Sequence, residues 1–539
     1  MTDPTPLSVT RRQLLGGAAV AGLAAIPVLS SKPALASTTA RPSNAAQARA
    51  AAALAGMTGS LSDVEHVVFV MMENRSFDHV YGTLSGVRGF DDRSVTLPGG
   101  GNIFAQPDVK SAKGFELPFR LATMTNNGQH TPSLDHGWSA QHLSRNDGSM
   151  DGWIAAHRSA DGDTNGVLTM GYYDRSDLPY HFALADAFTV MDHYHCSVLG
   201  PTYPNRLMWQ AGSIDAEGKG GGPLVTTDEG VFTGNTGKGV FSFETYPERL
   251  SKAGVEWACY ADATSNHLYN MLPSFKQFGV PGTDLYNRAQ GVTAPWGTLL
   301  KDAASGNLPA VSWAFPRADN SEHPALGSPN SGPNFYQPLI EALMRSPKWK
   351  NTVLFLTWDE NDGYFDHVAP PVAPPGTKGE YLQGPVFGKT ATKDPAAGIS
   401  GPVGLGFRVP TIVVSPFARG GYVNSEVSDH TSGLLFLEKR FGVEVTNLSD
   451  WRRSTVGDFT STMDFTRPDT SVPDLTAAFL ASQAAQTPTS TSGPVVPGSQ
   501  TMPTQEKGTR PRRGPVPAYV TAKQAPAKLT PSSRLPGAR

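Results

Sequence analysis

The chain has 539 residues, enough for one large or two medium domains, and its 39% hydrophobic and 17% charged residues indicate a globular protein. The formal net charge of -3 provides no basic field of the kind that nucleic-acid-binding proteins use, so we expect no nucleic-acid partner. The two cysteines, Cys196 and Cys259, form no CxxC or Cys/His cluster, which argues against structural zinc. Both a disulfide between them and two lone core cysteines remain open.

The N-terminus has the order of a secretory signal. Arg11 and Arg12 precede an apolar stretch over residues 16–30, and an Ala-Leu-Ala cleavage site follows at 34–36. A membrane anchor is the alternative, but the apolar stretch is short and rich in Ala and Gly. We therefore predict a twin-arginine signal peptide over residues 1–36, export through the twin-arginine translocase, and a secreted or cell-envelope protein. Retention of the precursor in the cytoplasm when both arginines are changed to lysine would identify this route.

Composition divides the rest of the chain into three parts. Residues 37–60 are rich in Ala, Ser and Thr and are predicted to be a linker, and residues 61–485 are predicted to form the catalytic domain. Residues 486–539 are predicted to be a disordered, Pro-rich basic tail, because eight Lys and Arg and no acidic residue lie within 507–539. A solvated end is the simpler interpretation, and weak adhesion to anionic lipid or wall polymer is the alternative.

Three short apolar runs, rich in β-branched and aromatic residues, are predicted to be buried parallel strands: 66–72, 353–358 and 409–415. A helix is predicted over 431–440, with Ser428 or Asp429 as its N-cap and Gly442 at its end. Alternating strands and helices predict an α/β fold in which a mainly parallel sheet lies between helices. In such sheets ligands bind beyond the carboxyl ends of the strands.

Polar residues follow the first two predicted strands directly. Glu73 and Asn74 come after the first strand, and Asp359 and Glu360 come after the second. Three carboxylates and an amide meeting at one sheet edge would repel one another unless a cation neutralised them. The oxygen-rich set predicts one hard divalent cation, Ca, Mg or Mn, with Zn as a further possibility. Simple capping of the helices that follow is the alternative.

A hydroxyl and several histidines could carry out chemistry beside such a cation. Thr202 precedes Pro204, a residue suited to the first turn of a helix, so Thr202 is predicted at or just before a helix N-terminus, where a phosphate can bind. Its alternative role is that of an ordinary N-cap. Three histidines directly follow an acidic residue in the sequence: His136, His323 and His430. A histidine next to a carboxylate can act as an oriented general acid or base.

Taken together, these segments resemble the bacterial phosphoesterase family that contains phospholipases C and a secreted acid phosphatase. The matching stretches occur in the family's order: 73–79, 171–173, 192–206, 322–324, 357–367 and 429–442. The strings Glu-Asn-Arg-Ser-Phe-Asp-His and Asp-Glu-Asn-Asp-Gly-Tyr-Phe-Asp-His are long and specific. The resemblance implies an alkaline-phosphatase-like three-layer sandwich with a central, mainly parallel sheet and helices on both faces.

The resemblance also implies roles for individual residues. Thr202 would be both the nucleophile and a ligand of the metal, with the other ligands being Glu73, Asn74, Asp359 and Glu360. His136 and His323 would contact the phosphoryl group or protonate the leaving oxygen, with Glu322 nearby. Further candidates for substrate binding are Arg75, His367 and His430, of which His430 is expected at the edge of the site or in a structural hydrogen bond. A cationic headgroup would need an aromatic wall or a carboxylate, and the aromatic candidates for such a wall are Trp138, Trp153, Tyr172 and Tyr173.

The resulting hypothesis is a secreted, metal-dependent phospholipase C. It would split the glycerol-side phosphodiester of phosphatidylcholine-like lipids into diacylglycerol and a phosphorylated headgroup, through a covalent phosphothreonine. Its partners would be a phospholipid or other phosphate ester and, transiently, a membrane surface. Thr rather than Ser at position 202 resembles the phospholipase branch. The alternatives are a secreted acid phosphatase of the same family and an inactive surface protein that binds lipid or phosphate.

Overall fold

The apolar run His66–Met72 forms β1, a fully buried strand in the interior of the central sheet. It lies between β11 (Thr352–Trp358) and β10 (Val311–Ala314) and runs parallel to both. The ring of Phe69 stacks on Phe355 and Trp313 at centroid distances of 5.5 and 5.7 Å. Large and β-branched side chains on both faces are typical of a strand covered on both sides. The first two strands predicted from the sequence are therefore confirmed.

The structure, a computed structural model, describes residues 59–227, 230–233, 239–262, 269–382, 400–486 and 492–515. The predicted signal peptide and nearly all of the predicted linker lie outside these residues. The sheet has eight strands in the order β16 (Arg512–Arg513), β15 (Val423–Asn424), β8 (Thr189–Met191), β14 (Thr411–Val414), β11, β1, β10 and β9 (Trp257–Tyr260).

The third predicted strand exists as β14, but its direction differs from the prediction. β14 runs antiparallel to both of its neighbours, β11 and β8, whereas the other strand pairs of this sheet are parallel. Parallel neighbours need a crossover that returns the chain to the starting edge, usually through a helix. The described residues between β11 and β14 form only the short strands β12 (Tyr381–Leu382) and β13 (Gly401–Pro402).

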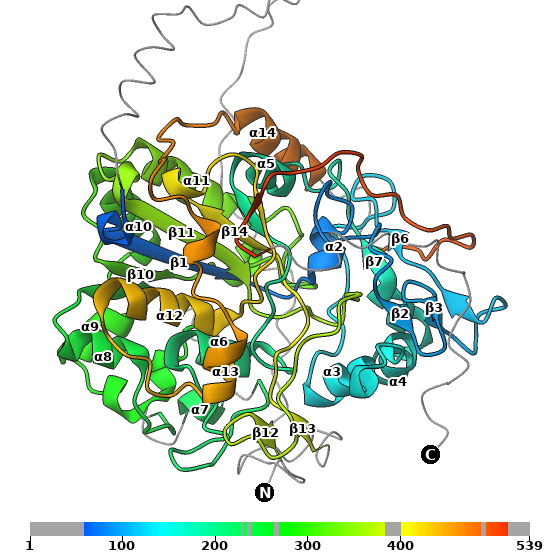
Figure 1. Cartoon of the computed structure of the whole chain (residues 1–539), viewed down its shortest axis with the longest axis horizontal. Helices are drawn as coiled ribbons and strands as arrows, with labels where there is room; N and C mark the ends of the chain where they lie inside the picture. The colour runs from blue at the N-terminus through cyan, green and yellow to red at the C-terminus, as the bar shows by residue number, and fades with distance from the viewer. Residues whose placement is uncertain are drawn as a thin grey trace, which may run out of the picture. The chain divides into compact units, whose positions relative to one another are not determined.

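Helices cover the sheet on both faces (Figure 1). One side carries α5 (Pro179–Ala187), α11 (Pro333–Arg345) and α14 (Thr476–Ala485), and the other carries α6 (Thr202–Ala211) and α12 (His430–Phe441). The predicted α/β fold with a mainly parallel sheet between helical layers is confirmed. Asp429 caps α12 by accepting from the Thr431 amide, and Gly442 ends it in a left-handed conformation with φ 70°, as expected.

An excursion of the chain between β1 and β8 packs beside the sheet, on the right of Figure 1. It contains α2 (Phe77–Tyr81), α3 (Trp138–Arg145) and α4 (Trp153–Asn165). Its short strands pair as β2 (Thr96–Leu97) with β3 (Gly101–Asn102), β4 (Gln106–Pro107) with β5 (Phe115–Glu116), and β6 (Phe119–Arg120) with β7 (Gly171–Tyr172). Further helices are α8 (Tyr246–Lys252), α9 (Asp284–Gln290), α10 (Pro295–Ser305) and α13 (Asp450–Thr455).

Residues 492–515 correct the prediction of disorder from residue 486 onward. This segment lies along the excursion and ends in β16, the edge strand that pairs with β15 (Figure 1). Gln505 donates to the carbonyls of Leu84 and Val87 at 2.6 and 3.0 Å, and Arg510 pairs with Asp186. Polar side chains rather than an apolar repeat hold the segment, so a hydrophobic pattern could not reveal it. Residues 516–539 lie outside the described part.

Two further sequence questions are answered by the described residues. Cys196 and Cys259 are both buried and unpaired, so they are lone core cysteines. None of the helices in the described ranges combines the length and the apolar character that crossing a bilayer requires.

Candidate active site

The carboxyl ends of β1 and β11 bring the predicted metal ligands together. Met72 and Trp358 are paired in register, so the residues that follow them, Glu73 and Asp359, leave the sheet side by side. The amides of Asn74 and Glu360 donate to Asp359 Oδ1 at 3.0 and 2.9 Å. Each of these four residues is at most 1% exposed. The sequence prediction that the two strand ends converge is therefore met by the geometry.

Helix α6, which begins at Thr202, contacts the same strand ends through Arg206, an arginine that sequence reasoning missed. Arg206 Nε lies 3.1 Å from Asp359 Oδ2, and its Nη2 pairs with Glu73. Thr202 is the first residue of α6, four residues before Arg206, so both lie on one face of the helix. The N-cap of α6 is Pro201, and no side-chain cap hydrogen bond forms there, which does not support a purely capping role for Thr202. The four-residue spacing was the available signal for Arg206.

The buried carboxylates at the strand ends are not fully neutralised by the cationic side chain beside them. Burial and the Asp359 carboxylate raise the pKa of Glu73 well above its usual range, against the effect of Arg206. Burial also raises the pKa of Glu360, while Arg206 lowers that of Asp359 although burial acts the other way. Asn74 Oδ1 and Glu360 Oε1 are buried without a hydrogen-bond partner. One guanidinium among three buried carboxylates, together with two orphaned oxygens, fits a hard divalent cation.

His136 and His323 face each other where this site reaches solvent. Their ring centroids are 6.3 Å apart, and the side chain of His136 is 17% exposed. His136 Nδ1 lies 2.9 Å from Asp362 Oδ1, and Nε2 lies 3.7 Å from Glu360 Oε1. Burial lowers the pKa of both imidazoles, but Glu360 and Asp362 outweigh it at His136, whose pKa is raised well above its usual value. The two predicted histidines are therefore close together, but the protein favours the protonated form of His136 and the neutral form of His323.

Glu322, predicted as a catalytic residue, points into a buried cluster behind this site. Its carboxylate accepts from Trp358 Nε1 at 3.1 Å, and His181 and Tyr336 lie at 3.1 and 3.2 Å from Oε1. Its backbone has φ 70°, a left-handed conformation that a residue other than Gly, Asn or Asp seldom adopts. Arg75 donates to the Glu322 carbonyl at 3.0 and 2.6 Å. Both Glu322 and Arg75 thus support the turn that presents His323.

His367 lies in a different buried cluster, together with Asp78, Asp366 and Arg408. Its Nδ1 is 2.6 Å from Asp78 Oδ2, and its Nε2 is 3.3 Å from Asp92 Oδ2. The two carboxylates and the imidazole could in principle hold a metal ion. Arg408 already occupies this position, with its Nη2 at 3.0 Å from Asp78 and 2.8 Å from Asp366. We therefore assign this cluster to structural ion pairing. The strand-end set also contains an arginine, but its oxygens at Asn74 and Glu360 lack hydrogen-bond partners, and it remains the candidate metal site.

The remaining candidates, His430 and four aromatic residues, make structural contacts in the protein. His430 Nε2 is 2.6 Å from the carbonyl of Asp359 and its Nδ1 is 2.9 Å from Tyr194 Oη, which is the structural role expected; burial lowers its pKa to about 4. The aromatic candidates pack in the interior or half-buried: Trp138, Trp153, Tyr172 and Tyr173. Tyr173 stacks edge-on against His79 at 4.7 Å, and Tyr172 packs on Phe90 at 4.9 Å. The described contacts give no aromatic wall around the phosphoryl site.

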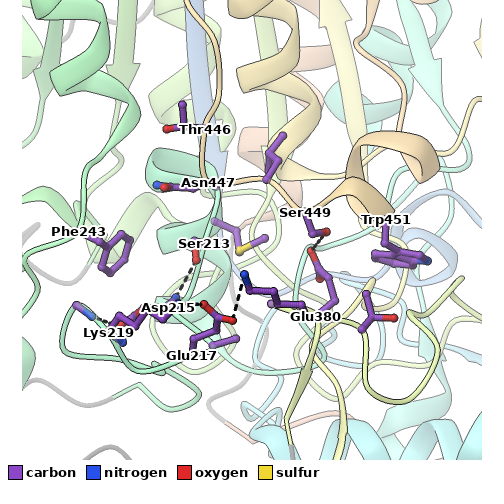
Figure 2. A pocket seen from close by; sticks show the side chains of 18 of the residues that line it. Ser213, Asp215, Glu217, Lys219, Phe243, Glu380, Thr446, Asn447, Ser449 and Trp451 are labelled. Carbon is purple, nitrogen blue, oxygen red and sulfur yellow. Dashed lines mark hydrogen bonds and ion pairs between the residues drawn. The ribbon is translucent and has the colours of Figure 1, made fainter.

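A cavity of about 660 Å³ lies at the other end of α6 (Figure 2). Met208 and Gly212 line it, and none of the predicted site residues does. Its buried acidic groups are already satisfied, since Glu380 accepts from Ser449 at 2.7 Å and Asp215 accepts backbone amides, including that of Lys219 at 3.0 Å. This cavity is therefore separate from the chemistry at Thr202.

Comparison with known proteins agrees with the site. The model of the Phosphoesterase family matches residues 64–444. Non-hemolytic phospholipase C of Pseudomonas aeruginosa is 40% identical over 464 residues, which cover 84% of this chain and 65% of that protein. Phospholipase C A of Mycobacterium tuberculosis is 39% identical over 481 residues, covering 85% of this chain and 90% of that one. The chain thus spans just under two thirds of the Pseudomonas relative.

Likeness to solved structures is much weaker. Murine ectonucleotide pyrophosphatase/phosphodiesterase 5 is 12% identical, with a TM-score of 0.30 over 52% of this chain and 94% of that one. A likeness this distant supports no conclusion about the site.

Proposed function

The chain belongs to the Phosphoesterase family, as its motifs predicted, and we propose that it is a metal-dependent phospholipase C acting on phosphatidylcholine-like lipids. At the level of the family, the comparisons confirm the expected phosphoric ester hydrolase. The lipid substrate, the covalent intermediate, the metal and the export route belong to the proposal. The names of the relatives support it, and so does the threonine at position 202.

One observation carries the proposal: the helix that begins at Thr202 is joined to two buried strand-end carboxylates through Arg206. Arg206 ties α6 to Glu73 and Asp359, and Thr202 lies one turn earlier on the same face of α6, which supports a position for Thr202 and the amides of the first helical turn near the strand ends. A helix N-terminus favours bound anions such as phosphate. Phosphoryl transfer of this kind needs a nucleophile, an anion-binding site for the phosphate and an acidic metal site close together.

The proposed cation would be held by Thr202 and by the strand-end ligands Glu73, Asn74, Asp359 and Glu360. When bound, it would act as a Lewis acid that favours ionisation of the hydroxyl and offsets charge on the phosphoryl oxygens. Arg206 holds two of these carboxylates, Glu73 and Asp359, in place.

The residues of the chain divide the reaction into two displacements. Thr202 gives its hydroxyl proton to water and its Oγ attacks phosphorus, so a P–O bond to Thr202 forms and the P–O bond to the glycerol oxygen breaks. His136 or His323 protonates that oxygen, so diacylglycerol leaves as the alcohol. Water then attacks the phosphothreonine and gives one proton to the same histidine. The P–O bond to Thr202 breaks, the phosphorylated headgroup is released, and the Thr202 oxygen takes a proton back from water.

A substrate panel with and without a chelator tests the proposal. We expect p-nitrophenyl phosphocholine, a soluble diester, to be hydrolysed faster than p-nitrophenyl phosphate, a monoester. A chelator should abolish turnover, and one of Ca, Mg, Mn or Zn should restore it. Elemental analysis should find about one metal equivalent per chain, and less in Glu73→Gln and Asp359→Asn variants.

Each failure has its own meaning. A preference for the monoester would favour the acid phosphatase alternative, and turnover that survives complete metal removal would reject the metal site. Binding of phosphocholine without hydrolysis of any substrate would favour the inactive surface protein.

A further inference from the structure

The proposed site opens to solvent beside its two histidines, where neighbouring loops form its edge. His136 and His323 are only partly buried, whereas the strand-end residues lie in the interior. Thr131, five residues before His136, accepts the amide of Ala325 at 2.9 Å, two residues after His323. The loops that lead to the two histidines are therefore joined at the mouth of the site.

The corrected C-terminal segment adds a third loop to this edge. Val495 exchanges two hydrogen bonds with the Asn126 side chain, at 3.0 and 2.9 Å. Residue 493 approaches the carbonyl of His130, since a Cβ at Gly493 would lie 3.5 Å from it. We call the stretches 122–131, 323–331 and 492–503 the rim loops.

The rim loops carry exposed apolar side chains and no formal charge. Met124 is 47% exposed, Leu326 is 53% exposed and Val495 is 71% exposed, one on each loop. None of the three stretches contains Asp, Glu, Lys or Arg, although such residues make up 17% of the chain. Single exposed apolar residues are ordinary on a soluble protein. An uncharged set on joined loops beside one site is typical of an interaction surface.

We propose that the rim loops dock this enzyme on the interface of a zwitterionic phosphatidylcholine bilayer, with Met124, Leu326 and Val495 entering the boundary between headgroups and acyl chains. This inference rests on the proposed function. The scissile phosphate of a phospholipid lies at that boundary, so the edge of the site must reach it while the acyl chains stay in the bilayer. Uncharged apolar side chains bind there through buried area rather than through attraction to anionic lipid.

The experiment measures flotation with phosphatidylcholine vesicles in a Thr202→Ala background, so that lipid is not consumed. Leu326→Ser, and Met124→Ser combined with Val495→Ser, should each weaken partition about tenfold. Val280→Ser is the matched control, because Val280 is 50% exposed but precedes α9, which packs on β9 at the far edge of the sheet. With Thr202 intact, the double variant should lose vesicle turnover in proportion and keep its turnover of soluble diester.

The outcomes separate docking from catalysis. Unchanged partition of the rim variants, or no partition of the parent protein, overturns the docking surface. So does binding that requires anionic lipid and falls with salt, which would assign adhesion to basic residues instead. Loss of soluble turnover in the double variant would show that the loops position the histidines rather than dock. Partition that follows our expectation in a protein that hydrolyses no diester would support docking and reject the proposed function.

Discussion

At the scale of residues, the site is defined by how one arginine is shared between two carboxylates. Arg206 contacts Glu73 and Asp359 from α6, and its side chain is completely buried. A buried charge without a partner is strongly destabilising, so this contact fixes the position of α6 relative to the two strand ends. Because Thr202 is the first residue of α6, the same contact restrains the position of Thr202.

Thr202 itself gives the sharpest test of the covalent mechanism. Thr202→Ala removes the attacking oxygen and should lower kcat by at least about 10³, because a positioned nucleophile is not easily replaced by water. Thr202→Ser keeps the oxygen and should retain measurable activity. Acid quench with a labelled phosphodiester should trap phosphate on the peptide that contains Thr202. Thr202→Ala with most of its activity intact would move the nucleophile to Ser197 or to a water molecule.

At the scale of elements, sequence patterns predicted which segments are buried and where helices and strands end better than they predicted the direction of a strand in the sheet. The apolar run of β1 ends at Met72, and the polar string after it predicted the site without any knowledge of the sheet. The cap at Asp429 and the glycine at 442 placed α12 because both act locally. The direction of β14 depends on how the chain crosses the fold, and an apolar run carries no such information. Arg206 pairs with residues over 130 positions away in sequence, so its four-residue spacing from Thr202 could place it on the same helix face but could not identify its partners.

The C-terminal segment leads to a prediction about truncation. A chain that ends at residue 491 loses β16, the pair between Arg510 and Asp186, and the two bonds that Gln505 donates. Its free energy of unfolding should fall by about 3–5 kcal/mol, because several buried carbonyls lose their donors together. A chain that ends at residue 515 keeps all of these contacts and is the matched control. Equal urea midpoints for the two chains would mean that the segment contributes nothing to stability.

At the scale of the whole molecule, a buried ion-pair cluster joins parts of the chain that are far apart in sequence. Arg408 precedes β14 and pairs with Asp366, which follows β11, and with Asp78, which follows β1. It also donates to the carbonyls of Arg88 and Asp192 at 2.8 Å each. The same cluster includes His367. It therefore ties the sheet to the excursion that carries one side of the site.

This cluster makes stability depend on pH in a direction that can be worked out. Burial alone would lower the pKa of His367, but Asp78 and Asp92 outweigh burial and raise it. Burial alone would raise the pKa of both carboxyls, but His367 acts in the opposite direction and the pKa of each is lowered. The imidazolium contribution is complete below the unfolded value of about 6.5 and is lost as pH rises through the raised folded value. The carboxylate contribution is present above about 3.9 and is lost as pH falls through the lowered folded values. The ion pairs of His367 with Asp78 and Asp92 should therefore stabilise the fold most between about pH 4 and 6.5. Burial raises the pKa of Asp366, so that carboxyl acts in the opposite direction as pH rises above about 3.9.

Comparison of the parent protein with His367→Gln isolates the upper side of that window. The loss in free energy of unfolding should be larger at pH 5.5 than at pH 9, by about 1 kcal/mol or more, since only a charged imidazole is favoured by both carboxylates. Urea unfolding at both pH values measures the difference. His142→Gln is the comparison variant: burial lowers the pKa of His142 to about 4, so at pH 5.5 only the unfolded state binds a proton there, and the substitution should cost about 1 kcal/mol less at pH 5.5 than at pH 9, the opposite trend to His367→Gln. A cost at His367 that does not change with pH would show that its ring acts only through packing and neutral hydrogen bonds.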